Sequence, residues 1–266
     1  MRTPVISLLT DFGSADHYVA AMKGVILGIC PRVQLVDISH GIAPYSIAEA
    51  GYTLAQAWEC FPEGTVHLVV VDPGVGSSRR PILAEADGHR FVAPDNGVLT
   101  MAFGGTARLR VREITAARYF RKPVSRTFHG RDIFAPVAAH LAGGAPPAKF
   151  GKLIADYVRL DGALPVRESA RQWSGRILKI DRFGNIVTNL DGATWERVVR
   201  GPFEVAIGAR TVSRLASSYA EVGGGEPFLI LGSAGYLEIG INQSSAADAL
   251  GVGVGAPFKL FFCERK

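Results

Sequence analysis

The stretch Val69-Val70-Val71-Asp72-Pro73-Gly74-Val75-Gly76-Ser77-Ser78-Arg79-Arg80 decides the fold class of this chain. Three consecutive β-branched residues indicate a short buried strand, and the Pro-Gly pair after Asp72 indicates a turn that ends it. Ligands of open α/β sheets bind at such carboxyl ends of strands, so Asp72 is a candidate site residue. The alternative is an aspartate that caps the amides of the turn, beside arginines that face solvent.

A second informative stretch is Phe128-His129-Gly130-Arg131-Asp132-Ile133-Phe134-Ala135-Pro136. The apolar residues after Asp132 predict a loop that enters a helix. This places His129 near the start of the helix, where an imidazole tends to stay neutral. A lone loop histidine is more often structural than functional, so His129 becomes a candidate only together with residues elsewhere in the chain.

Strands and helices alternate through the first 160 residues. Strands are predicted at residues 5–9, 33–38 and 66–71, with a hairpin of residues 82–86 and 91–93. Helices are predicted from an N-cap at Asp16 to about residue 29, from a capping box over residues 46–49 to about residue 58, and over residues 131–141. This order predicts an α/β domain over residues 1–160, with a mostly parallel sheet and helices on both faces.

The pattern changes after a predicted linker at residues 161–171. Short apolar runs at residues 175–180, 186–190, 203–207, 228–231, 236–241 and 258–263 are separated by glycine-rich turns and predict strands. We therefore expect a smaller all-β barrel domain over residues 172–266.

Composition narrows the class of protein. An apolar fraction of 48% in 266 residues allows a sizeable core, and 20% charged residues argue against disorder. The net charge is +5, and Arg108, Arg110 and Arg112 alternate with apolar residues, as in a strand with one solvated face. We interpret this charge as a source of solubility and expect no nucleic-acid partner. Three scattered cysteines, with no apolar run of membrane-spanning length, predict a cytoplasmic chain without disulfides.

Asp11 ends the first predicted strand, in the same topological position as Asp72. A carboxylate there can accept hydrogen bonds from both hydroxyls of a ribose, or it can cap a turn. Neither a Gly-x-Gly-x-x-Gly motif after this strand nor a Walker A motif occurs. Their absence argues against pyrophosphate and triphosphate ligands and leaves open a nucleoside without phosphates.

Two turns in the C-terminal half carry further candidates. In Asp181-Arg182-Phe183-Gly184-Asn185, the aromatic ring can stack on a purine and the Asn185 amide can both donate to and accept from a base edge. In Gly232-Ser233-Ala234-Gly235-Tyr236-Leu237-Glu238, Ser233 can bind an amino-acid carboxylate and Glu238 a positively charged group. Ordinary hairpin turns are the alternative for both segments.

Two other chemistries find little support. A hard-metal site could draw on Asp11, Asp72, Asp95, His129 and Asp132, but no local spacing typical of metal ligands joins them. A Ser-His-Asp hydrolase lacks its Gly-x-Ser-x-Gly elbow. We expect neither a metal nor a cofactor.

A set of short motifs, taken in order, resembles the S-adenosylmethionine (SAM) hydroxide adenosyltransferases, which are related to fluorinases and chlorinases. The motifs are Leu9-Thr10-Asp11-Phe12-Gly13, Met22-Lys23-Gly24, Asp72-Pro73-Gly74-Val75-Gly76 with Arg79, Pro94-Asp95-Asn96-Gly97, Phe128-His129-Gly130-Arg131-Asp132, Phe183-Gly184-Asn185 and Gly235-Tyr236-Leu237. The resemblance implies hydrolysis of SAM to adenosine and methionine. It also implies a homotrimer whose sites lie between the N-terminal domain of one subunit and the C-terminal domain of its neighbour.

The resemblance assigns roles to individual residues. The family's water-activating Asp-Arg-His set falls on Asp72, Arg79 and His129. Its ribose-binding acid falls on Asp11, and its adenine-side asparagine falls on Asn185. The halogenases carry a tyrosine in place of Asp72 and lack the histidine, so both departures favour water over halide as the nucleophile.

Two further departures concern substrate binding. The aromatic near the ribose is a tryptophan in the fluorinase and Tyr45 in this chain, and an arginine beside the methionine-binding serine of the halogenases is replaced by Ala234. We therefore predict Asp72, Arg79 and His129 as catalytic residues. The predicted substrate-binding residues are Asp11, Tyr45, Asp181, Phe183, Asn185, Ser233 and Glu238. The alternatives are a SAM-dependent halogenase and a module that binds adenosine or SAM with incidental turnover.

Overall fold

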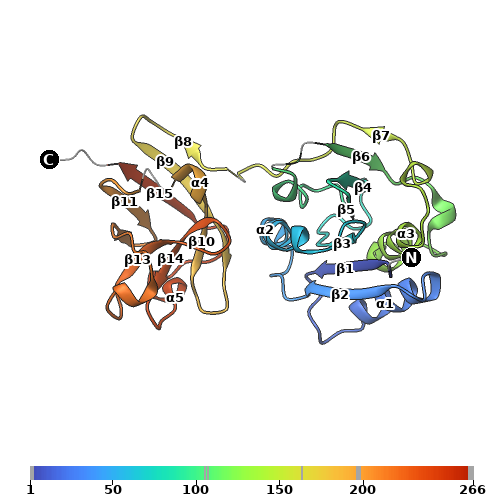
Figure 1. Ribbon diagram of the computed structural model, residues 1–266, viewed down its shortest axis with the longest axis horizontal. Coiled ribbons are helices and arrows are strands. Elements are labelled where there is room, and N and C mark those ends of the chain that lie inside the picture. The colour runs from blue at the N-terminus through green and yellow to red at the C-terminus, as the bar shows by residue number, and fades with distance from the viewer. Residues whose placement is uncertain (1–2, 105, 107, 163, 196–198, 263–266) are drawn as a thin grey trace. The chain divides into compact units, whose positions relative to one another are not determined.

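The computed structural model describes residues 3–104, 106, 108–162, 164–195 and 199–262. The chain divides into two compact units, Met1–Leu160 and Asp161–Lys266 (Figure 1). Each unit has its own sheet and its own apolar core. No helix within these residues has the length and apolarity needed to cross a bilayer.

The first unit is built on a seven-stranded sheet with the order β2-β1-β3-β5-β4-β6-β7. Its strands are β1 (Val5–Thr10), β2 (Gln34–Ser39), β3 (Val66–Val70), β4 (Pro81–Ala86), β5 (His89–Pro94), β6 (Leu109–Glu113) and β7 (Leu153–Ile154). The pairs β1/β2, β1/β3 and β3/β5 are parallel, whereas β4/β5, β4/β6 and β6/β7 are antiparallel. The predicted α/β class is confirmed, and the sheet is mixed, with its parallel part at β1, β2, β3 and β5.

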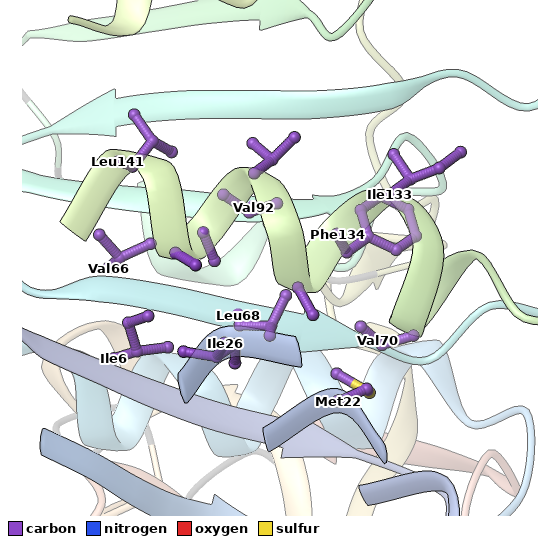
Figure 2. Packing of buried hydrophobic residues seen from close by; sticks show 14 of the residues in the cluster. Ile6, Met22, Ile26, Val66, Leu68, Val70, Val92, Ile133, Phe134 and Leu141 are labelled. Carbon is purple, nitrogen blue, oxygen red and sulfur yellow. The ribbon is translucent and has the colours of Figure 1, made fainter. Parts of the chain in front are cut away.

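Helices cover both faces of this sheet. Alternate strand residues point to opposite faces, so Leu8 and Leu68 pack with α1 (Tyr18–Ile29) and α3 (Ala135–Ala142), while Leu9 and Val69 pack with α2 (Ile47–Ala57). Figure 2 shows residues of β1 and β3 between α1 and α3. Burial of each such side chain contributes roughly 1.5–3 kcal/mol, which makes the sheet a rigid base for the loops at its strand ends.

One helix start and one capping interaction differ from the prediction. The N-cap of α1 is His17 rather than Asp16, because the helix begins only at Tyr18. Ser46 is the N-cap of α2 as predicted, but its side chain makes no cap hydrogen bond. The Glu49 carboxylate instead accepts a hydrogen bond from the backbone N–H of Ala43 at 3.0 Å, so it holds the chain that enters the helix.

The second unit contains one antiparallel sheet that curls strongly into a half-barrel (Figure 1). Its strands are β8 (Val166–Arg167), β9 (Gln172–Ile180), β10 (Ile186–Asp191), β11 (Phe203–Ile207), β12 (Arg210–Val212), β13 (Pro227–Leu231), β14 (Tyr236–Ile241) and β15 (Pro257–Phe262). The order is β12-β11-β15-β9-β10-β14-β13, with β8 on β9. This agrees with the all-β prediction. β8 lies inside the segment predicted as a linker, and Cys263, the predicted end of the last strand, lies outside the described residues.

The remaining elements are short. They are the 3-10 turns η1 (Trp58–Cys60), η2 (Met101–Phe103), η3 (Ala117–Tyr119), η5 (Pro147–Lys149) and η6 (Tyr219–Glu221), the π-helical turn η4 (Gly130–Phe134), and the helices α4 (Gly192–Trp195) and α5 (Ala246–Leu250). The predicted helix over residues 131–141 is thus a π turn that continues into α3. π turns recur at functional sites, and this one directly follows His129.

Candidate active site

Asp72 lies on the loop after β3, and two contacts fix that loop. The Asn96 side-chain amide donates a hydrogen bond to the carbonyl of Val71 at 2.8 Å. Gly76 has a φ of +77°, and a Cβ there would lie 2.3 Å from the carbonyl oxygen of Arg126. Only glycine fits this position without displacing backbone, and the resulting tight loop returns the chain so that Arg79 meets Asp72.

Asp72, Arg79 and His129 form one hydrogen-bonded group. The Arg79 Nε donates to Asp72 Oδ1 at 2.9 Å, and its Nη2 donates to Asp72 Oδ2. The same Nη2 lies 3.1 Å from His129 Nδ1. Because a guanidinium can only donate, His129 Nδ1 must accept, which places the proton of a neutral imidazole on Nε2. The side chains of Asp72 and Arg79 are only 6% and 7% exposed.

Burial and charge shift the protonation of this group. Burial raises the pKa of the Asp72 carboxyl, while the charge and hydrogen bonds of Arg79 oppose that rise. Burial lowers the pKa of His129, and the Arg79 charge lowers it further. A neutral imidazole is what the Arg79 hydrogen bond requires. The group therefore combines a carboxyl whose basicity is enhanced by burial with an uncharged histidine.

A cavity of about 340 Å³ brings together most predicted site residues of the first unit. Asp11, Tyr45, Asp72 and His129 line it, whereas Arg79 contacts Asp72 and His129 and is not part of the lining. The Asp11 carboxylate accepts the backbone N–H of Tyr45 at 2.9 Å. Tyr45 has a φ of +68°, an unusual conformation for a residue other than glycine. One carboxylate oxygen of Asp11 thus holds the Tyr45 backbone in this conformation.

The cavity wall includes aromatic residues without a role in the sequence prediction. Phe12, Tyr18 and Phe128 lie with ring centroids 5.1–6.0 Å apart. All three line the cavity. Phe12 and Phe128 stand next to predicted site residues in the quoted motifs, so their positions carried a signal. Tyr18 carried none, because its place depends on where α1 begins.

The predicted residues of the second unit line a separate cavity of about 880 Å³ within that unit. Asp181 organises one side of it by accepting the backbone N–H groups of Phe183 at 2.8 Å and Asn185 at 2.9 Å. Its second oxygen accepts the Asn185 side-chain amide at 2.9 Å. Phe183 is 79% exposed, so its ring is free to stack on a flat ligand.

Glu238 and Ser233 line the same cavity, and among the described residues no lysine, arginine or histidine lines it. Burial raises the pKa of the Glu238 carboxyl, and the nearby Asp181 raises it further. The Glu238 carboxyl lies against Gly232, where an added Cβ would be 1.9 Å from Oε1. Tyr219 also lines this cavity and was missed from sequence. Its pKa is raised by burial, by Glu238 and by Asp181.

Two of the carboxylates considered for a metal site, Asp95 and Asp132, have partners outside the 340 Å³ cavity. Asp95 accepts Arg80 Nε at 2.9 Å and the backbone N–H of Val158 at 2.8 Å, and Asp132 pairs with Arg131 and Arg121. Within the part of the chain that the structure describes, no three His, Cys, Asp or Glu side chains gather as metal ligands.

Comparisons with known proteins cover nearly the whole chain. Family models described as the SAM hydroxide adenosyltransferase N-terminal and C-terminal domains match residues 6–151 and 175–259. The (R)-S-adenosyl-L-methionine hydrolase of Thermus thermophilus is 38% identical over 96% of this chain and 98% of its own length. A fluorinase of Nocardia brasiliensis is 29% identical over 92% of this chain and 93% of its own.

A solved structure is also similar to this chain over nearly its whole length. The crystal structure of an uncharacterized conserved protein from Thermotoga maritima superposes with a TM-score of 0.85 at 38% identity, and covers 96% of this chain and 99% of that one. The similarity therefore spans both units.

Proposed function

The chain belongs to the SAM hydroxide adenosyltransferase family, and from this we infer that it hydrolyses SAM to adenosine and methionine. The observation that carries the proposal is the contact of Arg79 with both Asp72 and His129 at the edge of the 340 Å³ cavity. Because the Thermus relative is named for the (R) epimer at sulfur, we propose that epimer as the preferred substrate.

The reaction replaces one bond at the ribose C5′ by another. A water oxygen forms the new C–O bond, the C–S bond breaks with its electron pair staying on sulfur, and the water loses one proton to the protein. The leaving group is a neutral thioether, so it needs neither a strong acid nor a metal ion. The protein must hold one water in line with the breaking bond and accept its proton.

The geometry supports separate roles for the three residues. Asp72 is the proton acceptor in this proposal, because its oxygens retain lone pairs beside the Arg79 bonds, whereas His129 Nδ1 already accepts from Arg79. His129, held neutral with its proton on Nε2, can donate to the water oxygen and orient it. Arg79 keeps Asp72 ionised by charge pairing before the reaction and fixes the imidazole through Nδ1.

The substrate is held by the remaining predicted residues in this proposal. Asp11 accepts from the ribose hydroxyls beside Tyr45, and Phe183 stacks on the adenine while Asn185 hydrogen-bonds its edge. At the amino-acid end, Ser233 binds the carboxylate and the carboxyl of Glu238 binds the ammonium group. Asp181 contributes by fixing Phe183 and Asn185. We also propose the homotrimer implied by the family, which light scattering would contradict by finding a monomer.

Incubation of the purified protein with each SAM epimer, followed by chromatography, tests the reaction. We expect adenosine and methionine in equal amounts, and more from the (R) epimer. A 5′-halogenated adenosine formed in the presence of chloride or fluoride would identify a halogenase instead. Tight binding of adenosine with negligible turnover would identify a binding module.

A further inference from the structure

A buried carboxylate outside the Asp72–Arg79–His129 group lies three residues after His129. The Asp132 side chain is fully buried, at 0% exposure. Its Oδ1 accepts Arg131 Nε at 2.7 Å and Arg121 Nη1 at 3.2 Å. Its Oδ2 accepts Arg131 Nη2 at 2.9 Å and the backbone N–H of Ser125 at 2.8 Å. Burial would raise the pKa of this carboxyl, but these hydrogen bonds outweigh it and lower the pKa overall.

These bonds close a loop around the cavity wall. The backbone carbonyl of Asp132 also accepts the N–H of Arg121 at 2.9 Å, so one residue joins positions 121 and 125 to the π turn. The chain held between them includes Thr127, Phe128 and His129, all of which line the 340 Å³ cavity. Arg131 extends the connection, because its guanidinium lies 5.1 Å from the centroid of the Phe128 ring.

The same segment contacts the loop that carries Arg79. The carbonyl oxygen of Arg126 lies so close to Gly76 that an added Cβ would be 2.3 Å away. A shift of residues 125–128 would therefore reach both His129 and the loop of Asp72 and Arg79. Asp132 is placed to govern the relative position of all three proposed catalytic residues.

Asp132 also acts on His129 through its charge. The charged groups that affect the imidazole are Arg79, which lowers its pKa, and Asp72 and Asp132, which raise it. Arg131 lies on the same π turn and compensates part of the Asp132 charge. Asp11 and Tyr18 line the same cavity from β1 and α1.

We propose that Asp132 is a positioning residue for the hydrolysis: it fixes the turn that carries His129 through its bonds to Arg121, Ser125 and Arg131, and its negative charge acts on the His129 ring. The catalytic part of this inference rests on the proposed function. The electrostatic part does not, because it concerns the titration of His129 in the protein alone.

Two substitutions with opposite expected signs test the inference. Asp132→Asn keeps the size of the side chain and an oxygen for the Ser125 N–H, but removes the negative charge. It should move the titration of His129, and the acid limb of kcat/KM, to lower pH by about half a unit, as expected for one partly screened charge. Arg131→Gln leaves the Asp132 charge less compensated and should move both to higher pH.

Asp132→Asn should also lower kcat about 10-fold or more, because small displacements of catalytic groups are costly. Glu85→Gln is the matched control, since it removes a carboxylate of the same unit that is ion-paired to Arg112 at 3.6 Å and does not line the 340 Å³ cavity. It should leave kcat and the acid limb unchanged.

Proton NMR of the His129 ring follows the titration without reference to turnover. If Asp132 had a purely structural role, the variants would have a lower melting temperature, but the His129 titration would not move in opposite directions in Asp132→Asn and Arg131→Gln. That result would overturn the inference. If Asp132→Asn does not fold, the inference depends on Arg131→Gln alone. A His129 titration in that variant that does not move to higher pH would then overturn the inference. A wild-type protein that releases no adenosine rejects the proposed function, while the titrations still decide the charge effect.

Discussion

Replacing Arg79 by methionine is the most informative perturbation of the Asp72–Arg79 pair. Methionine fills most of the volume of the arginine stem, so the main change is the loss of the guanidinium. Asp72 is then left as a buried carboxylate with 6% exposure and without its charged partner. The same substitution removes the donor to His129 Nδ1.

The expected cost follows from the burial of both partners. Removing one member of a buried ion pair typically destabilises a protein by about 3–5 kcal/mol, because the remaining charge is uncompensated. With 6% and 7% side-chain exposure, this pair belongs to that class rather than to surface pairs. We expect Arg79→Met to lower the free energy of unfolding by about 3–5 kcal/mol at pH 7.5.

The effect should depend on pH in a defined direction. Without Arg79, burial loses its main opponent and raises the pKa of Asp72 further above its unfolded value, with only His129 and the backbone N–H of Gly74 still lowering it. A folded state that binds a proton more readily than the unfolded state gains stability as pH falls. The destabilisation should therefore be largest above the raised pKa and should shrink toward pH 5. The double variant Asp72→Asn/Arg79→Met, which leaves no buried charge, should recover about 2 kcal/mol.

Urea unfolding followed by circular dichroism at pH 7.5 and pH 5 measures these differences. Glu85→Gln, the loss of a carboxylate ion-paired to Arg112 at 3.6 Å, provides a comparison that leaves the Asp72–Arg79 pair intact. A destabilisation by Arg79→Met below about 1 kcal/mol, the range of exposed ion pairs, would refute the reasoning. A loss of stability that does not change with pH would refute it as well.

Three further predictions concern catalysis and stability. Asp72→Asn keeps the shape of the side chain but not its basicity, so turnover should fall about 10²–10⁴-fold while adenosine affinity by calorimetry changes little; unchanged turnover removes Asp72 from the mechanism. Excess EDTA should leave adenosine release unchanged, because the thioether leaving group needs no Lewis acid, and abolished activity would support metal-dependent hydrolysis. Burial and the His89 charge lower the pKa of His67 to about 3, so the unfolded state binds a proton below about pH 6.5 and the folded state does not. That difference should cost about 2–3 kcal/mol of unfolding free energy between pH 7 and pH 4.5, and His67→Phe should show a smaller loss in urea unfolding over the same range.

The strand ends could be predicted because their signals are local. A β-branched run followed by Asp-Pro-Gly identifies both a buried strand and its end, and Asp11 follows the same logic one strand away. Parallel pairing of β1 with β3 then places the two aspartates at one edge of the sheet. The capping signals were weaker, because the Ser46 side chain makes no cap hydrogen bond and the Glu49 carboxylate accepts the backbone N–H of Ala43, which precedes the helix.

The roles of several residues could not be predicted, because they depend on partners distant in sequence. Asn96 supports the carbonyl of Val71 from 25 positions away. Asp132 appeared only in a motif and among the metal-site candidates, and its side-chain hydrogen bonds to Arg121 and Ser125 depend on the path of residues 121–125. Tyr219 lines the same cavity as Glu238 and Asp181 only because the second sheet curls around that cavity.

The sequence by itself determined the α/β and all-β classes of the two units, since alternation and turn chemistry act over a few residues at a time. Its ordered motifs also indicated the family. The tertiary structure alone decided that Arg79 reaches His129 across 50 positions, with the imidazole as acceptor. Such contacts arise when burial of apolar faces packs a π turn against a strand-end loop, and no local pattern of residues encodes that approach.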